Sequence, residues 1–213
     1  MLFRSVQMCF IWASAAQAQG LQSLQDFLQH SRAGRSDFVQ RVHPPKRADQ
    51  TPRIKTSRGH LTYQRPLSFR LEYLAPDRLI LLADGKEFWQ IDPDLQQVTV
   101  RDQKSALIGS AAALILTATD LATLRHSFEV RPLPDADGLA WVELNPKDTE
   151  GSLRQLRVGF QGHGPATRVA VIEFSDGFGQ QTRLEFNSFE AANAWPGATF
   201  QYKPPPGYQV LRP

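Results

Sequence analysis

The chain has 213 residues, a formal net charge of +3 and a hydrophobic content of 41%. This balance is typical of globular proteins and excludes disordered and fibrous classes. The basic residues are spread along the chain rather than gathered in runs, so nothing points to nucleic-acid binding. We therefore expect one domain with a sizeable core and no nucleic-acid partner.

Residues 1–18 have the features of a secretory signal peptide. Arg4 supplies the positive charge, residues 6–15 form a short apolar stretch, and residues 16–18 read Ala-Gln-Ala, a typical cleavage site. An N-terminal core helix is the alternative interpretation. Cleavage would remove Cys9, the single cysteine, and would leave residues 19–213 as one domain without a stable membrane anchor. Such a protein is expected to be released into the periplasm or secreted.

The mature chain should begin with a helix and continue as a series of strands. Residues 21–34 carry apolar side chains at helical spacing and end at Gly34, a typical helix stop. Alternating patterns then predict strands over 38–42, 59–64, 68–74, 77–83, 86–91 and 96–101. Asp84-Gly85 and Asp92-Pro93-Asp94 have the composition of hairpin turns.

The pattern changes at residues 104–127, which are rich in Ala and Leu and lack strand alternation. We expect short helices here, with Ser110 and Asp120 as their N-caps. Strands resume over 128–133, 139–145, 153–160, 168–175 and 182–189, and the proline-rich tail should wrap an edge of the sheet. The prediction is a mainly β fold: one large antiparallel sheet that curls toward a barrel, with its concave apolar face covered by the two helical segments.

Residues 63–76 contain one exception to their pattern. Tyr63, Phe69 and Leu71 lie on the apolar side of the alternation, and Arg65 occupies that same side. An arginine there either lays its stem on apolar surface and keeps its charge in water, or donates hydrogen bonds to carbonyls beneath the helical cover. The pattern alone leaves both interpretations open.

No catalytic motif is present in the sequence. The histidines are isolated, and neither a nucleophile elbow nor a phosphate-binding glycine loop occurs. A hydrolase remains an alternative, because the distance between two carboxylates is not visible in a sequence. We expect a non-enzymatic binding protein without a cofactor or a metal.

Several ordered motifs resemble one family, the periplasmic lipoprotein carriers of the LolA type. They are RPLSFRLEYLAP (65–76), LLADGKEFWQIDPDLQQVTV (81–100), VELNPKD (142–148), IEFSDGFGQQTRLEF (172–186) and the tail F-x-Y-K-P-P-P-G-Y-x-V (200–210). The chain departs from the usual pattern at Leu71, where many members have Trp, and at Ala111, where many have Pro. The resemblance extends over the whole mature chain.

The resemblance implies an unclosed antiparallel β-barrel with a helical lid over a hydrophobic cavity. It implies a monomeric chaperone that takes acylated lipoproteins from a LolCDE-type inner-membrane ABC transporter and delivers them to a LolB-type outer-membrane receptor. Arg65 matches the family's latch arginine, which bonds to the backbone of the lid, and Phe69 matches an aromatic position linked to cargo hand-off.

The remaining candidate residues are apolar and belong either to the cavity or to the lid. Those expected to line the cavity are Phe69, Leu71, Tyr73, Leu79, Leu81 and Phe88. Those expected in the lid are Leu107, Ile108, Leu114, Ile115 and Leu116. Core and cavity lining look alike in a sequence. The alternatives are a carrier of another amphiphile, such as a glycolipid or fatty-acyl species, and a LolB-like receptor, which the early position of Cys9 disfavours.

Overall fold

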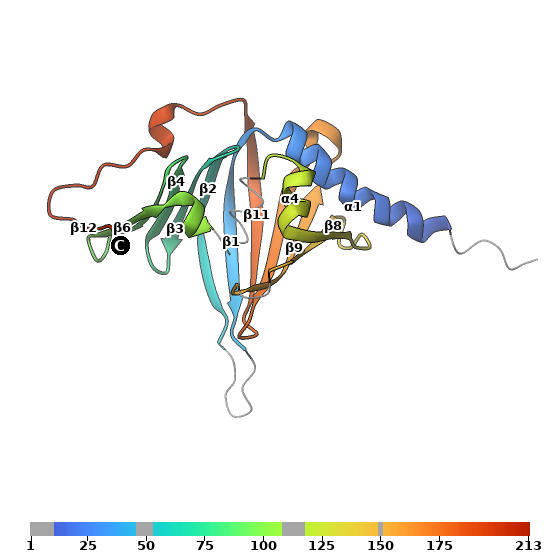
Figure 1. The fold of residues 1–213 in the computed structure, drawn as a ribbon, viewed down its shortest axis with the longest axis horizontal. Coiled ribbons are helices and arrows are strands. Elements are labelled where there is room, and N and C mark those ends of the chain that lie inside the picture. Colours follow the sequence, from blue (N-terminus) through green and yellow to red (C-terminus); the bar gives the residue numbers. More distant parts are fainter. Residues whose placement is uncertain (1–10, 46–52, 108–117, 149–150) are drawn as a thin grey trace, which may run out of the picture.

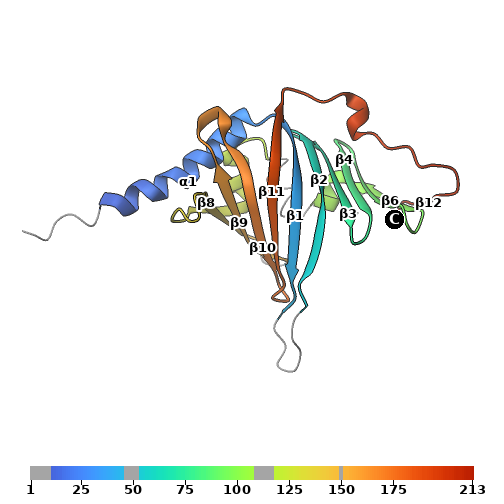
Figure 2. The same cartoon turned by 180° about the vertical axis from the view of Figure 1, so that it is seen from behind.

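A computed structural model describes residues 11–45, 53–107, 118–148 and 151–213. Twelve strands form one sheet in the order β12-β6-β5-β4-β3-β2-β1-β11-β10-β9-β8-β7. The edges β12 and β7 do not pair with each other, so the predicted unclosed sheet is confirmed. All neighbouring strands are antiparallel except β12 and β6, which are parallel. Helices α1 and α4 lie over one face of the curved sheet (Figure 1), and the strands are in front when the molecule is seen from behind (Figure 2).

Eleven of the twelve observed strands correspond to predicted ones, with ends that differ by at most five residues, and the twelfth, β12, lies in the tail that was expected to wrap an edge. Their bounds are β1 Ala33–His43, β2 Lys55–Gln64, β3 Ser68–Ala75, β4 Leu79–Asp84, β5 Glu87–Asp92, β6 Gln97–Asp102, β7 Phe128–Pro132, β8 Ala140–Pro146, β9 Leu153–Gln161, β10 Arg168–Asp176, β11 Gln181–Ala192 and β12 Gln209–Leu211. Both predicted turns are present. Asp84 Oδ1 accepts from the backbone of Lys86 and Glu87, and Asp92 Oδ1 accepts from that of Asp94.

Helix α1 spans Ile11–His30, and no helix in the described part of the chain is long and apolar enough to cross a membrane. The prediction that this helix runs to Gly34 was wrong, because Gly34 lies in β1. The chain leaves the helix at Ser31 and Arg32, where the Arg65 backbone N–H donates to Arg32 O, and Ala33 then pairs with Gln64. Strand pairing therefore ends the helix earlier than the glycine would.

The main core lies between the concave face of the sheet and the helices. Leu24, Phe27 and Leu28 of α1 are buried there with apolar residues of β1–β3 and β8–β11. The ring of Phe27 packs 6.5 Å from that of Tyr63 and 5.9 Å from that of Phe160, so it joins both halves of the sheet. Helix α1 rests on β7, β8 and β9. The expected cover of the concave face by the N-terminal helix is confirmed.

A second, smaller core lies on the opposite face of β4–β6. It contains Leu82, Ile91, Val98 and Val100, against which Tyr202 and Tyr208 of the C-terminal tail pack. The tail ends in β12, which pairs with β6 at the edge of the sheet, as predicted. This second core explains why residues 79–82 are apolar at every position, since both faces of β4 are covered.

Candidate functional site

Arg65 lies in the turn between β2 and β3 and not within a strand. The predicted boundary between strands 59–64 and 68–74 is confirmed, since β2 ends at Gln64 and β3 begins at Ser68, but the face assigned to Arg65 from the alternation of 63–76 does not apply, because Arg65 belongs to neither strand. Because it is free of the strand register, the Arg65 side chain reaches under the end of helix α1.

The Arg65 guanidinium donates to two separate segments of backbone. Its Nη1 atom lies 3.0 Å from Phe27 O, 3.1 Å from Leu28 O and 3.4 Å from Ser31 O, all at the end of α1. Its Nη2 atom donates to Ala118 O, which precedes α4. The last carbonyls of a helix have no partner within the helix, so they are ready acceptors. One side chain thus connects β2–β3, α1 and the segment before α4.

The surroundings of Arg65 are mostly apolar. The centre of the guanidinium lies 5.2 Å from the centroid of the Phe27 ring, and its Nε atom is buried without a hydrogen-bond partner among the described residues. Burial lowers the pKa of Arg65, yet an arginine keeps its charge near neutral pH. Four backbone carbonyls therefore stabilise the charge, while the Nε–H group has no acceptor among the described residues.

A second hydrogen bond ties the end of α1 to β2. The hydroxyls of Ser31 and Tyr63 are 2.5 Å apart, and both residues are buried. Burial raises the pKa of Tyr63, so the phenol stays protonated at neutral pH. This contact fixes the position of the helix end whose carbonyls accept from Arg65. These acceptors were not predicted from the sequence. The available signal was the unpaired carbonyl groups at the end of the predicted helix.

The six predicted cavity residues lie on one face of the sheet. Leu71 pairs with Leu81, Tyr73 pairs with Leu79, and Ala83 pairs with both Phe69 and Phe88. Residues directly opposite each other in a sheet share a face. Phe69, Leu71 and Phe88 belong to the main core, and Tyr73 and Leu81 pack against it. The structure therefore places this set on the concave side beneath the helices.

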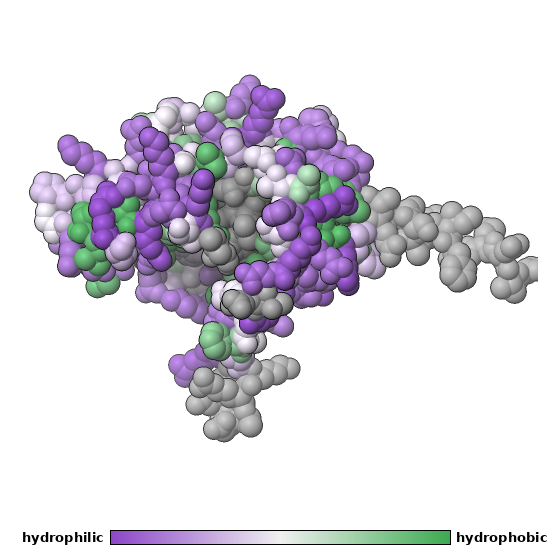
Figure 3. All heavy atoms as spheres, viewed as in Figure 1, coloured by the Kyte–Doolittle hydropathy of each residue, from purple (hydrophilic) through white to green (hydrophobic). Residues whose placement is uncertain are grey.

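The apolar space between α1 and the sheet is small. A cavity of about 20 Å³ is lined by Phe27, Tyr63 and neighbouring apolar residues of β2, β10 and β11. Larger clefts of about 610 and 220 Å³ are lined mostly by polar and charged side chains. Figure 3 shows mostly hydrophilic residues on the described part of the helix-bearing face. Among the described residues, little apolar space is therefore open between α1 and the sheet.

The insertion, residues 103–127, is described at its two ends. Helix α2 (Gln103–Leu107) lies against β5 and β6, and Leu107 is buried in the main core. Ile108, Leu114, Ile115 and Leu116 of the expected lid lie outside the described residues, as does the expected N-cap Ser110. The other expected N-cap is confirmed: Asp120 Oδ1 accepts from the Thr123 backbone N–H at 2.7 Å, at the start of α4 (Leu121–Ser127).

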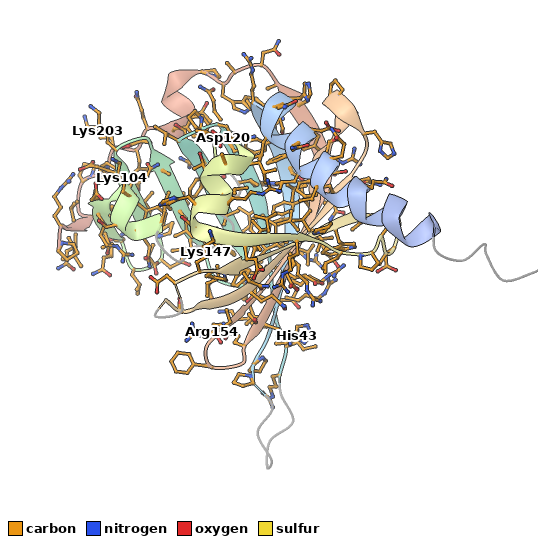
Figure 4. The ribbon with its side chains drawn as sticks, turned by 45° about the vertical axis from the view of Figure 1, so that its right-hand side comes forward. His43, Lys104, Asp120, Lys147, Arg154 and Lys203 are labelled. Atoms are coloured by element: carbon orange, nitrogen blue, oxygen red, sulfur yellow. The ribbon has the colours of Figure 1, made fainter. Side chains whose placement is uncertain are left out.

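Helix α4 is also fastened at its far end. Lys147 Nζ donates to Arg125 O at 2.7 Å, which satisfies a terminal carbonyl. Figure 4 shows Asp120 and Lys147 close to helix α4, and His43 and Arg154 lower in the view, toward the ends of the strands. Among the described residues, no group of three or more His, Cys, Asp or Glu side chains is placed to hold a metal ion.

Comparison with known proteins agrees with this geometry. The family model described as "Outer membrane lipoprotein carrier protein LolA" matches residues 29–203. An outer-membrane lipoprotein carrier protein of Albidiferax ferrireducens is 43% identical, covering 94% of each chain. One from Leptothrix cholodnii is 40% identical over 99% of this chain and 94% of its own, and one from Bordetella pertussis is 34% identical over 94% and 88%.

Solved structures show the same fold at low sequence identity. A LolA superfamily protein from Nitrosomonas europaea has a TM-score of 0.50 at 13% identity and covers 87% of this chain and 98% of its own. An uncharacterized conserved protein from Thermus thermophilus has a TM-score of 0.52 at 14% identity, with 95% and 99% covered. The unclosed sheet with its helical cover, together with the match to the family model and to close relatives, shows that this chain belongs to the LolA family of outer-membrane lipoprotein carrier proteins.

Proposed function

We propose that this protein is a non-enzymatic periplasmic chaperone that binds the acyl chains of lipoproteins and carries them toward the outer membrane. The observation that carries the proposal is the placement of Arg65, whose guanidinium connects the end of α1 to Ala118 over a closed apolar face. The names of the relatives support lipoprotein cargo over a glycolipid or a free fatty-acyl species. Residues 1–18 serve as the export signal.

The physical need for such a carrier follows from the cost of exposing acyl chains to water. Each methylene group taken out of water contributes about 0.8 kcal/mol, so a lipid chain does not cross an aqueous compartment unaided. Ligand pockets usually have volumes of about 300–1,000 Å³. The described apolar cavity of about 20 Å³ is far smaller. The cover must therefore move before an acyl chain is accommodated against Phe69, Leu71 and Phe88.

Arg65 is the latch that holds this cover. Hydrogen bonds that involve a charged group contribute about 1.5–3 kcal/mol each, which a few buried methylene groups offset. The Nη1 atom stays with the end of α1, which the core holds firmly, while the Nη2 bond to Ala118 O opens with the insertion. The latch is thus strong enough to keep the empty protein closed and weak enough for cargo to open it.

The partners follow from the family resemblance. A LolCDE-type inner-membrane transporter supplies the lipoprotein, and a LolB-type outer-membrane receptor accepts it. The carrier acts as a monomer, because one sheet with its helical cover provides the whole apolar face.

Co-purification tests this proposal. The full chain is expressed with its own signal in a periplasm that contains a triacylated lipoprotein, as wild type and as Arg65→Leu. Mass spectrometry measures the bound lipoprotein and the N-terminus of the mature chain. We expect Arg65→Leu to accumulate lipoprotein and to release less of it to an acceptor membrane carrying the receptor.

Arg35→Leu is the matched control, because Arg35 is half-exposed and pairs with Glu190 on the opposite face of the sheet. It should load and release cargo as the wild type does. If neither the wild type nor Arg65→Leu carries lipoprotein, the latch would be contradicted. Equal amounts of lipoprotein on Arg65→Leu and Arg35→Leu would also contradict it. A glycolipid or free acyl species in place of lipoprotein would contradict the cargo assignment.

A further inference from the structure

A gap in the side chains of β2 brings two aromatic rings together on the concave face. Gly59 pairs with Phe38 of β1 on one side and with Tyr73 of β3 on the other. A Cβ atom at Gly59 would lie 1.8 Å from the backbone Glu72 O and 2.8 Å from Phe38 Cε1, so no larger residue fits there. The rings of Phe38 and Tyr73 meet edge-on above the glycine, with centroids 5.1 Å apart. Tyr73 is thereby directed across β2 toward β1.

The hydroxyl of Tyr73 ends at Gln40 of β1. Tyr73 Oη donates to Gln40 Oε1 at 2.9 Å. Burial raises the pKa of Tyr73 to about 12, so the hydroxyl carries its proton at any physiological pH. The bond occupies the oxygen end of the amide and holds its plane. The two N–H groups of Gln40 Nε2 then have no acceptor in the part of the chain that the structure describes.

A second unused polar group lies beside Gln40. Ser57 pairs directly with Gln40 across β1 and β2, and its position shares a face with Gly59 and Leu61. Ser57 is only 7% exposed, and no described residue forms a hydrogen bond with its hydroxyl. Neither Gln40 Nε2 nor Ser57 Oγ is among the fully enclosed atoms without a partner, so both donors remain accessible from the concave face. Two accessible donors side by side therefore suit a ligand atom that accepts hydrogen bonds.

We infer that Gln40 and Ser57, with the amide oriented by Tyr73, form a recognition point for the carbonyl oxygen of an acyl ester or amide. This inference rests on the proposed function, because it assumes that acyl chains occupy the concave face. Leu71 and Phe69 continue the same face from Tyr73, so a chain lying along them would end its apolar part where the donors begin. A carbonyl oxygen accepts from both groups, whereas an ether oxygen is a far poorer acceptor.

The test compares two lipids that differ only at this carbonyl. The probes are a palmitoyl lysophospholipid and its ether-linked analogue with the same chain and headgroup, both below their micelle concentrations. Each displaces a fluorescent fatty-acid analogue from the full-length mature protein. One neutral hydrogen bond corresponds to a three- to tenfold difference in affinity, roughly, so the wild type should prefer the ester lipid by about that factor.

Gln40→Leu should abolish the preference and leave the affinity for the ether lipid unchanged. Tyr73→Phe, which removes the orienting hydroxyl but keeps the ring, should reduce the preference partway. Gln29→Leu, on the exposed side of α1, is the matched control and should keep it. Ser57→Ala removes only the hydroxyl of the second donor and should also reduce the preference for the ester lipid. This variant replaces Gln40→Leu in the experiment if Gln40→Leu does not fold.

The outcomes separate the two ideas. A wild type that binds both lipids equally, or a preference that survives in Gln40→Leu and Ser57→Ala, would overturn the recognition point and leave the carrier function intact. A wild type that binds neither lipid would overturn the carrier function and the recognition point with it.

Discussion

Two segments cover apolar faces of the sheet, and they are held in different ways. Helix α1 and the insertion lie over the concave face, where one side chain, Arg65, joins the end of α1 to Ala118. The C-terminal tail lies over the opposite face of β4–β6, where Tyr202 packs 6.3 Å from Trp89 and β12 pairs with β6. The link between α1 and Ala118 depends on a few directional bonds, whereas the tail is held by strand pairing and apolar packing.

This difference shows how one fold separates a permanent closure from a reversible one. Strand pairing and aromatic burial distribute the stabilisation over many atoms, so no single event releases the tail. The bonds of Arg65 to Ala118 can be lost in one step while α1 stays packed on the sheet.

Removal of residues 202–213 should have the largest effect on stability. The deletion uncovers Leu82, Ile91 and Val98 and removes two packed tyrosines, and each fully buried large apolar side chain contributes about 1.5–3 kcal/mol. We expect the free energy of unfolding in urea to fall by about 3 kcal/mol or more. An unchanged midpoint would mean that the tail is not a structural cover.

Alkaline pH should weaken the protein through Tyr73 on the concave face. Burial raises its pKa to about 12 in the folded state, whereas an unfolded tyrosine ionises near pH 10. The contribution is therefore complete below about pH 10 and is lost as the pH rises toward about 12, to a total of about 2–3 kcal/mol. Urea unfolding across this range measures it. Tyr73→Phe should have a shallower dependence, and identical slopes for the two proteins would contradict the assignment.

Tyr63→Phe should destabilise the end of α1 by about 1–2 kcal/mol, because it leaves the buried Ser31 hydroxyl without its partner. Since Ser31 O is also an acceptor of Arg65, the same change should increase hydrogen exchange at the end of α1. Ser31→Ala combined with Tyr63→Phe removes both hydroxyls and should recover part of the loss. Additive effects of the two substitutions would indicate that the hydroxyls do not interact.

Arg212→Ala should have the smallest effect. Arg212 pairs with Glu87 and lies 5.8 Å from the centroid of the Trp89 ring, but its side chain is 57% exposed. Exposed ion pairs contribute about 0.2–1 kcal/mol and are weakened by salt. We expect a loss within this range at low salt and less at high salt. A loss as large as that of the tail deletion would show that polar contacts hold the tail.

Much of the fold was predictable because local chemistry determines it. The strands follow from alternation, and Asp84 and Asp92 form the expected turns because their carboxylates accept from the backbone that follows. Asp120 caps its helix for the same reason. The two apolar faces of residues 79–82 were visible in the sequence. The tail that covers one of them lies about 120 residues away, which no local pattern reveals.

The site was predictable only in part. The odd position of Arg65 drew attention to it, but the residue lies in the turn between two strands, where alternation does not determine the direction of a side chain. The carbonyls of α1 that accept from Arg65 are determined by where the helix ends. The helix ends before Ala33 because Ala33 pairs with Gln64, and not at Gly34 as the sequence predicted. The hydrogen bond between Tyr73 of β3 and Gln40 of β1 spans the strand between them, β2. It forms because Gly59 of β2 is paired with Tyr73, and this pairing depends on the strand register, which the sequence does not show.

The reversible cover can be tested most directly by distances measured between spin labels in the mature chain. One pair joins Arg125→Cys on α4 to Lys86→Cys in the β4–β5 turn, and the other joins Gln29→Cys on α1 to the same turn; all three positions are exposed. Adding a palmitoyl lysophospholipid should lengthen the first distance and leave the second unchanged. In Arg65→Leu the first distance should be long before any lipid is added. If both distances lengthen together, or if Arg65→Leu matches the wild type without lipid, then Arg65 is not the latch.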